Sequence, residues 1–266
     1  MEIPFVRWYE AIWKRRSRRY FTSKPIPPEI LEGLDFICTN FKPFNSVRSV
    51  LLTESYDAIF KGAFGNYGKI KGAPSIIAFV GDIDDKNVYE KIGYTGEGII
   101  LEATSLGLGT CWVGGFFRPD VAASIIKTKE NEKVIAVTPV GYPEDKMTFE
   151  EKVMTGFGIT HKRRPLKEIL SGVEESKLQP FIKQALDAAR VSPSAVNRQP
   201  WRFHVKADAI TVSTDNLKDT FNIPKRIDCG IAMLHIEVAL LNFGISGKWE
   251  FLNPPDVARF KFKLKY

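Results

Sequence analysis

Two short basic runs in the sequence have the composition of a phosphate-binding site. The first basic run, residues 14–19 (KRRSRR), contains five cations and the hydroxyl of Ser17. The second basic run, residues 161–164 (HKRR), contains three further cations. Arginine guanidinium groups form paired hydrogen bonds with phosphate oxygens, and a serine hydroxyl adds another donor. The eight cations together exceed the net charge of the chain, which is +7. The sequence therefore predicts an anionic ligand at these runs.

Such basic runs could also serve a nucleic acid or a membrane surface, and composition alone does not choose among these partners. Nucleic-acid-binding segments usually interleave cations with exposed aromatic residues or glycines, and neither run does so. Apolar residues at positions 8, 9, 12 and 13 form one face of a helix that leads into the first basic run. We therefore expect the first basic run to end an ordered helix.

A further motif is the PSAVNRQPW loop, residues 193–201, which combines turn residues, two amide side chains and an aromatic ring. It is either a plain turn between a helix and a strand, with Asn197 and Gln199 capping backbone groups, or part of a binding site. The glycine-rich segment 62–72 is likewise either a solvated loop or part of a site. The histidines lack the spacing of metal ligands, and His235 is expected to be a core or surface residue of a helix.

Hydrophobic periodicity predicts long helices and separated strands, which is typical of an α+β fold. Helices are predicted at 28–37, 93–106, 178–191 and 227–243, and strands at 49–54, 75–81, 133–141, 201–205, 209–214 and 260–266.

The chain contains a faint internal repeat, which indicates two related halves. Residues 28–54 resemble residues 178–207 at an offset near 154, and the helix before Trp112 resembles the helix before Trp249 at an offset of 137. The second half therefore lacks about 17 residues, which by position correspond to the glycine-rich segment. Each half also holds a motif that the other lacks. If the two halves are related and pack together, their motifs would build one composite site. The alternative is that the similarity between these segments arose by chance and the halves are unrelated.

Composition excludes several classes of protein. The 266 residues are 44% hydrophobic and 26% charged, as in globular proteins of one large or two small domains. No segment approaches the roughly 20 apolar residues of a membrane helix, and the N-terminus lacks the pattern of a secretory signal. The three cysteines are widely spaced and odd in number, which favours free thiols. We therefore expect a cytoplasmic protein.

With these motifs the sequence resembles the nitroreductase family of FMN-dependent oxidoreductases over nearly its whole length. It looks most like the single-chain branch described as "putative TM nitroreductase", in which two nitroreductase-like halves form a pseudo-dimer. Ordinary members are homodimers whose FMN sites take a phosphate clamp from one subunit and a P-S-x-x-N-x-Q-P-W loop from the other. The resemblance implies an α+β, nitroreductase-like fold with degenerate halves at residues 1–170 and 171–266. It also implies a monomer with one flavin.

The resemblance implies FMN contacts from five segments of the sequence. They are Arg15, Arg16, Ser17 and Arg163 at the phosphate; Arg19, Asn66 and Lys69 at the flavin ring; Trp112, Val113, Gly114 and Gly115 near N5 and O4; and Pro193, Ser194, Ala195, Asn197 and Gln199 from the second half. Gly114 replaces an acidic residue of some relatives, and Ala195 replaces a common serine, so the contacts of those side chains are expected to be lost. No catalytic side chain and no metal is predicted, because flavin N5 carries the chemistry.

The resemblance implies an enzyme that reduces a small nitro-aromatic or quinone-like acceptor with hydride from NAD(P)H by a ping-pong mechanism. It implies a small-molecule substrate, with neither a nucleic acid nor a membrane as partner. The alternatives are a different flavin reaction such as dehalogenation or flavin fragmentation, a non-catalytic flavin-binding protein, and a nucleic-acid-binding protein that uses the basic runs. The sequence does not choose NADH over NADPH, because it offers no G-x-G-x-x-G fingerprint.

Overall fold

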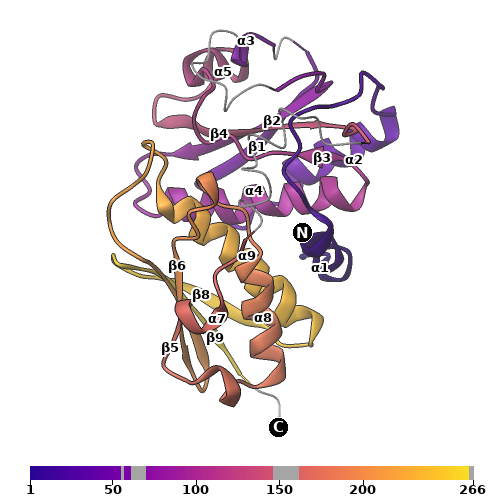
Figure 1. Ribbon diagram of the computed structural model, residues 1–266. Coiled ribbons are helices and arrows are strands. Elements are labelled where there is room, and N and C mark those ends of the chain that lie inside the picture. The colour runs from indigo at the N-terminus through magenta and orange to yellow at the C-terminus, as the bar shows by residue number, and fades with distance from the viewer. Residues whose placement is uncertain (55–56, 61–69, 146–161, 264–266) are drawn as a thin grey trace.

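Two sheets form the framework of the protein (Figure 1). The computed structural model describes residues 1–54, 57–60, 70–145 and 162–263. The strands are β1 Val47–Leu52, β2 Ser75–Asp82, β3 Gly109–Thr110, β4 Glu132–Gly141, β5 Leu170–Ser171, β6 Trp201–Lys206, β7 Ala209–Thr214, β8 Gly247–Phe251 and β9 Asp256–Phe262. The first sheet has the order β1-β2-β4-β3 and is antiparallel. The second has the order β5-β6-β7-β9-β8, in which β5 runs parallel to β6.

Helices pack on both sheets and between them. They are α1 Phe5–Lys14, α2 Pro28–Asn40, α3 Asp57–Phe60, α4 Val88–Ser105, α5 Pro119–Ile126, α7 Leu166–Ile169, α8 Pro180–Arg190 and α9 Lys225–Asn242. Every helix and strand predicted from periodicity has a counterpart, with its ends displaced by a few residues. Residues 264–266 of the last predicted strand lie outside the described residues. The structure adds α5, which starts at a proline as helices often do, and the strand β8. Among the described residues, no helix has both the length and the apolar character needed to cross a bilayer.

The internal repeat is present in the structure. β1 and β6 are both six residues long at an offset of 154, and α4 and α9 are both 18 residues long at an offset of 137. The order β1-β2-β4-β3 returns as β6-β7-β9-β8. Residues 53–74 connect β1 to β2, whereas residues 207–208 connect β6 to β7. The segment that the second half lacks therefore lies at this connection, as the two offsets predict.

The pair α4 and α9 joins the two halves. α4 packs against the first sheet, α9 packs against the second, and the two helices pack against each other, so both lie between the sheets (Figure 1). They meet at Gly93 and Gly230, which are themselves related by the offset of 137. A Cβ at Gly93 would lie 2.0 Å from the Ile227 carbonyl oxygen, and one at Gly230 would lie 2.0 Å from the Glu90 carbonyl oxygen. The close contact of the two backbones therefore requires glycine at both positions.

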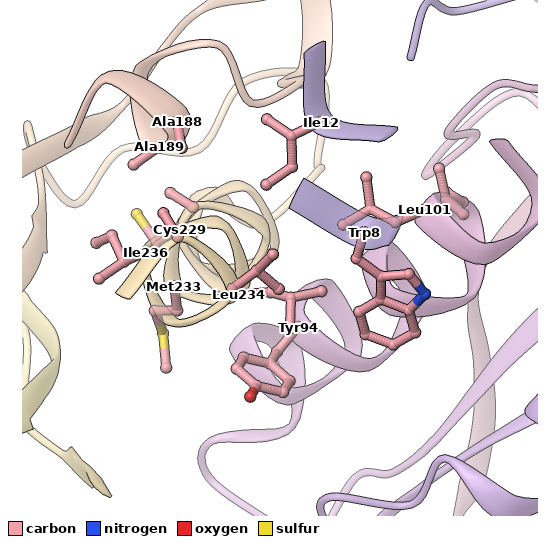
Figure 2. Packing of buried hydrophobic residues seen from close by; sticks show 14 of the residues in the cluster. Trp8, Ile12, Tyr94, Leu101, Ala188, Ala189, Cys229, Met233, Leu234 and Ile236 are labelled. Carbon is pink, nitrogen blue, oxygen red and sulfur yellow. The ribbon is translucent and has the colours of Figure 1, made fainter. Parts of the chain in front are cut away.

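One hydrophobic core runs through both halves. A continuous cluster of buried side chains includes Phe79 of the first sheet and Phe203 of the second, with α1, α4, α8 and α9 between them. Figure 2 shows Trp8 of α1, Tyr94 of α4 and Leu234 of α9 packed together in this cluster. Because the halves share their core, they form one compact unit. β5 spans the predicted boundary at residues 170 and 171, and it pairs with β6 of the second sheet.

The close contact of α4 and α9 predicts that one added methyl group at this contact greatly reduces the stability of the protein. We expect Gly230→Ala to lower the free energy of unfolding by about 3 kcal/mol or more, because its Cβ would overlap backbone rather than a flexible side chain. Urea denaturation followed by circular dichroism measures this. Gly33→Ala in α2 is the matched control: nothing lies within 4 Å of its Cβ position, so it should stabilise by up to about 1 kcal/mol. Equal effects of the two substitutions would contradict the proposed contact.

Candidate functional site

A cavity of about 500 Å³ has walls from both halves of the chain, a volume typical of small-molecule sites. Its walls come from the segment after α1, the loop after β3, Arg163, the PSAVNRQPW loop and the N-terminal part of α9. Thirteen of the residues that the sequence predicts to bind FMN line this cavity. They are Arg15, Arg16, Ser17, Arg19, Trp112, Val113, Gly114, Gly115, Arg163, Pro193, Ser194, Ala195 and Asn197.

The other three predicted residues are Asn66, Lys69 and Gln199. Asn66 and Lys69 fall outside the described residues. Gln199 is not among the residues that line the cavity. Its side-chain oxygen accepts a hydrogen bond from the Arg164 backbone at 2.8 Å, and its amide nitrogen donates to the Lys162 carbonyl at 3.1 Å. The buried side chain of Gln199 therefore holds the second basic run against the PSAVNRQPW loop through hydrogen bonds.

The first basic run lies at the end of a helix, as the sequence predicts, but its residues after Lys14 are extended. α1 ends at Lys14, and Arg15 has the extended backbone angles φ −55° and ψ 130°. The segment then lies beside β3: Ser17 bridges to Thr110, and the Arg18 backbone donates to the Thr110 carbonyl at 2.8 Å. Alternate side chains of an extended segment point to opposite sides. Arg15, Ser17 and Arg19 follow this alternation and line the cavity, and Arg16 lines it as well, while Arg18 donates a hydrogen bond to the Glu144 carbonyl.

The cavity concentrates positive charge at one end. Arg15 is 7% exposed, and its Nη1 atom has no hydrogen-bond partner among the described residues. Burial lowers the pKa of Arg15, although Glu97 opposes this shift. Burial, together with Arg15, Arg16 and Arg190, lowers the pKa of Arg163 to about 10. These arginines lower one another's pKa, and Arg15 Nη1 is a buried donor without a partner among the described residues. Such a group is suited to bind an anion with several acceptor oxygens.

The PSAVNRQPW loop holds a strained backbone against this charged end. Val196, Asn197 and Gln199 have positive φ angles of 48°, 56° and 49°, a region that non-glycine residues rarely adopt. The Asn197 oxygen accepts a hydrogen bond from Arg163 Nη1 at 2.8 Å. The loop therefore does more than join a helix to a strand, because it also positions Arg163 in the cavity. Such strain is typical of binding sites that the surrounding structure holds in place.

A buried ion pair fixes the other side of the loop. Asp228, near the start of α9, accepts hydrogen bonds from Arg198 Nε at 2.6 Å and from the Ala195 backbone at 3.2 Å. Arg198 also donates to the Ile223 carbonyl at 2.8 Å. Burial raises the pKa of Asp228 to about 6, and Arg198 acts against that rise. Asp228 is thus a buried carboxylate at the cavity wall whose main contact is with the loop.

The loop after β3 forms an uncharged wall. Val113 pairs with Val137 of β4 through two backbone hydrogen bonds of 2.9 Å. Gly114 and Gly115 face Ile223, and a Cβ at Gly114 would lie 3.2 Å from that side chain. The Trp112 indole nitrogen donates to Glu97 at 2.7 Å. This wall presents backbone and apolar groups to a ligand.

Sequence reasoning missed two acidic residues of the site, Glu97 and Asp228. Both are charged residues on mostly buried helices, and each lies at most 3% exposed. Their signal was present, since an acid within an apolar helix needs a partner. It also missed the aromatic residues Phe116 and Phe221, which line the cavity, remain partly exposed and have positive φ angles. Among the described residues there is no group of three or more acids, cysteines or histidines that could hold a metal.

The corresponding place in the other half is filled with aromatic rings. At the offsets of 137 and 154, Gly114 corresponds to Phe251, and Arg198 corresponds to Phe44. The rings of Phe44 and Phe251 lie 5.5 Å apart, and Phe44 lies 5.3 Å from Tyr94. The two halves have therefore diverged, with an open cavity at one position and a packed aromatic cluster at the other.

This fold is nitroreductase-like. Over 98% of this chain and 96% of the other, the structure superposes on a "putative nitroreductase" from Thermotoga maritima with a TM-score of 0.66 and 20% identity. A nitroreductase family protein from Clostridium difficile matches 61% of this chain and 96% of its own, with a TM-score of 0.48 and 24% identity. No curated protein matches the sequence.

The family assignment comes from the sequence itself. Residues 7–240 match the family model described as "Putative TM nitroreductase", so the chain belongs to this family of oxidoreductases.

Proposed function

We propose that the protein is an FMN-dependent oxidoreductase that reduces a small nitro-aromatic or quinone-like acceptor with hydride from NAD(P)H in a ping-pong reaction. The observation that carries this proposal is the composite cavity. Arg15, Arg16 and Arg163 crowd its charged end, where Arg15 Nη1 has no partner among the described residues, and residues 112–115 add a wall of backbone and apolar groups. FMN has the same polarity, with a phosphate at one end and a planar ring at the other.

The residues present would divide the binding of FMN between the two halves. Arg15, Arg16, Ser17 and Arg163 would hold the phosphate with charged and hydroxyl donors. Residues 112–115 would lie along the ring, and residues 193–197 would cover the site from the second half. Arg19 and Lys69 would stabilise negative charge on the reduced ring. When bound, the flavin would supply the hydride-accepting centre that no side chain of the site provides.

We further infer one flavin per chain and a monomeric, cytoplasmic protein whose partners are small molecules. The aromatic cluster of Phe44, Tyr94 and Phe251 occupies the position related to the cavity, which supports a single site. The shared core and the α4–α9 contact take the place of a subunit interface, which supports a fused pseudo-dimer with halves near residues 1–170 and 171–266.

The test is an anaerobic titration of the FMN-loaded protein with NADH and with NADPH. We expect one FMN per chain and bleaching of the flavin absorbance by at least one nicotinamide, followed by recovery of the colour when a quinone or nitro-aromatic acceptor is added. A protein that binds FMN but is bleached by neither nicotinamide would be a flavin-binding protein or would catalyse a different flavin reaction. A protein that takes up no FMN would contradict the proposal.

A further inference from the structure

A buried carboxylate and histidine lie directly behind the charged end of the cavity. Glu97 of α4 and His235 of α9 are both 0% exposed, and Glu97 Oε1 lies 3.0 Å from His235 Nε2. The other Glu97 oxygen accepts the hydrogen bond of Trp112, a wall residue of the cavity. Arg15 Nε lies 3.8 Å from Oε1, the oxygen that faces His235. The pair therefore contacts two residues of the site without lining the cavity itself.

The hydrogen-bond geometry fixes how many protons this pair carries. His235 Nδ1 lies 2.9 Å from the Ala188 carbonyl oxygen, which can only accept, so Nδ1 carries a proton. Ser192 Oγ lies 3.0 Å from the same nitrogen. The contact between Nε2 and Glu97 Oε1 needs a second proton, because two lone pairs would otherwise face each other in a dry interior. Whether that proton sits on nitrogen or on oxygen, the pair has no net charge.

A neutral pair has a direct consequence for Arg15. An unprotonated Glu97 without His235 would be a buried carboxylate 3.8 Å from Arg15 and would cancel its charge. The proton that His235 brings prevents this. The acid at the cavity wall, Asp228, is likewise engaged by Arg198. The positive charge of Arg15 is therefore left for a ligand.

The geometry points to His235 as a positioning residue that neutralises Glu97 and so keeps the charge of Arg15 available to a phosphate-bearing ligand. This inference deepens the proposed function and rests on it for the identity of that ligand. The anion site itself can be tested without a flavin, so the two can fail separately.

The experiment measures binding of inorganic phosphate by thermal shift, and of FMN and riboflavin by fluorescence, at pH 8. We expect His235→Asn to weaken phosphate and FMN binding about tenfold, because Glu97 becomes ionised and pairs with Arg15. Riboflavin has no phosphate, so its affinity should be unchanged. In the Glu97→Gln background, the His235→Asn substitution should have no further effect on phosphate or FMN, because the carboxylate that would capture Arg15 is absent.

The controls separate this role from simple packing. His204→Asn changes a histidine outside the cavity lining that contacts Ser171, and it should leave phosphate binding as in the wild type. His235→Gln replaces His235→Asn if the latter does not fold. An equal loss of phosphate binding with and without the Glu97 carboxylate would overturn the inference, as would a wild type that binds no phosphate. If phosphate binding follows the expected pattern but FMN does not bind, the proposed function fails and the inference stands.

Discussion

Replacing Arg15 by glutamine is expected to lower the affinity for FMN about 100-fold, or about 2.7 kcal/mol. Arg15 is the most deeply buried cation of the cavity, and its Nη1 atom has no other partner among the described residues. A charge-assisted hydrogen bond to phosphate in such a place is much stronger than one in water. The dissociation constant can be measured by quenching of flavin fluorescence.

Two comparisons show whether the loss comes from the phosphate. Riboflavin lacks that group, so Arg15→Gln should weaken its binding far less than that of FMN. Arg48→Gln is the matched control, because Arg48 forms a 2.8 Å ion pair with Glu132 away from the cavity lining. It should leave FMN affinity as in the wild type. Equal weakening of FMN and riboflavin by Arg15→Gln would place Arg15 away from the phosphate.

Asp228→Ala is expected to lower the free energy of unfolding by about 3–5 kcal/mol at pH 8, because it removes the oxygen acceptors of two buried donors, Arg198 Nε and the Ala195 amide. The side chains of Asp228 and Arg198 are 4% and 8% exposed, and their atoms lie 2.6 Å apart. Asp228→Ala would leave Arg198 buried without its carboxylate and would free the Ala195 backbone donor. Urea denaturation measures the stability. Glu90→Ala, which breaks the ion pair between the buried Glu90 and the half-buried Arg226, should also lower the free energy of unfolding but should leave FMN affinity intact.

The pH dependence of stability gives a second measure of Asp228. Its pKa is about 6 in the folded protein against an ordinary value of 3.8, so folding favours the protonated form. The contribution of this group to stability is complete below about pH 4 and is lost as the pH rises through 6, by about 3 kcal/mol in total. Asp228→Asn removes the titrating group. The stability of the wild type should therefore fall relative to that of Asp228→Asn between pH 4 and 6. Parallel curves would contradict the raised pKa.

Much of the fold could be predicted from the sequence because hydrophobic periodicity is local. The run at residues 75–81 is apolar without a break, and β2 is indeed buried on both faces. The alternation at the C-terminus predicts inward Phe260 and Phe262, and both are buried. The predicted ends of the helices and strands were less accurate than their types. β9 starts at Asp256, and the first basic run leaves α1 after Lys14, because pairing with neighbouring strands competes with helical propensity.

The sequence by itself determined the element types, the repeat with its two offsets and the motifs divided between the halves. The tertiary structure alone decided that both motifs meet in one cavity, that Gln199 ties the backbone outside it, and that Glu97 and His235 form a buried pair behind Arg15. These contacts join residues far apart in the chain, such as Glu97 and His235 on two crossing helices. A periodic hydrophobic pattern indicates which side of a helix is buried. The packing of the two glycines at the α4–α9 contact decides which side chains then face each other.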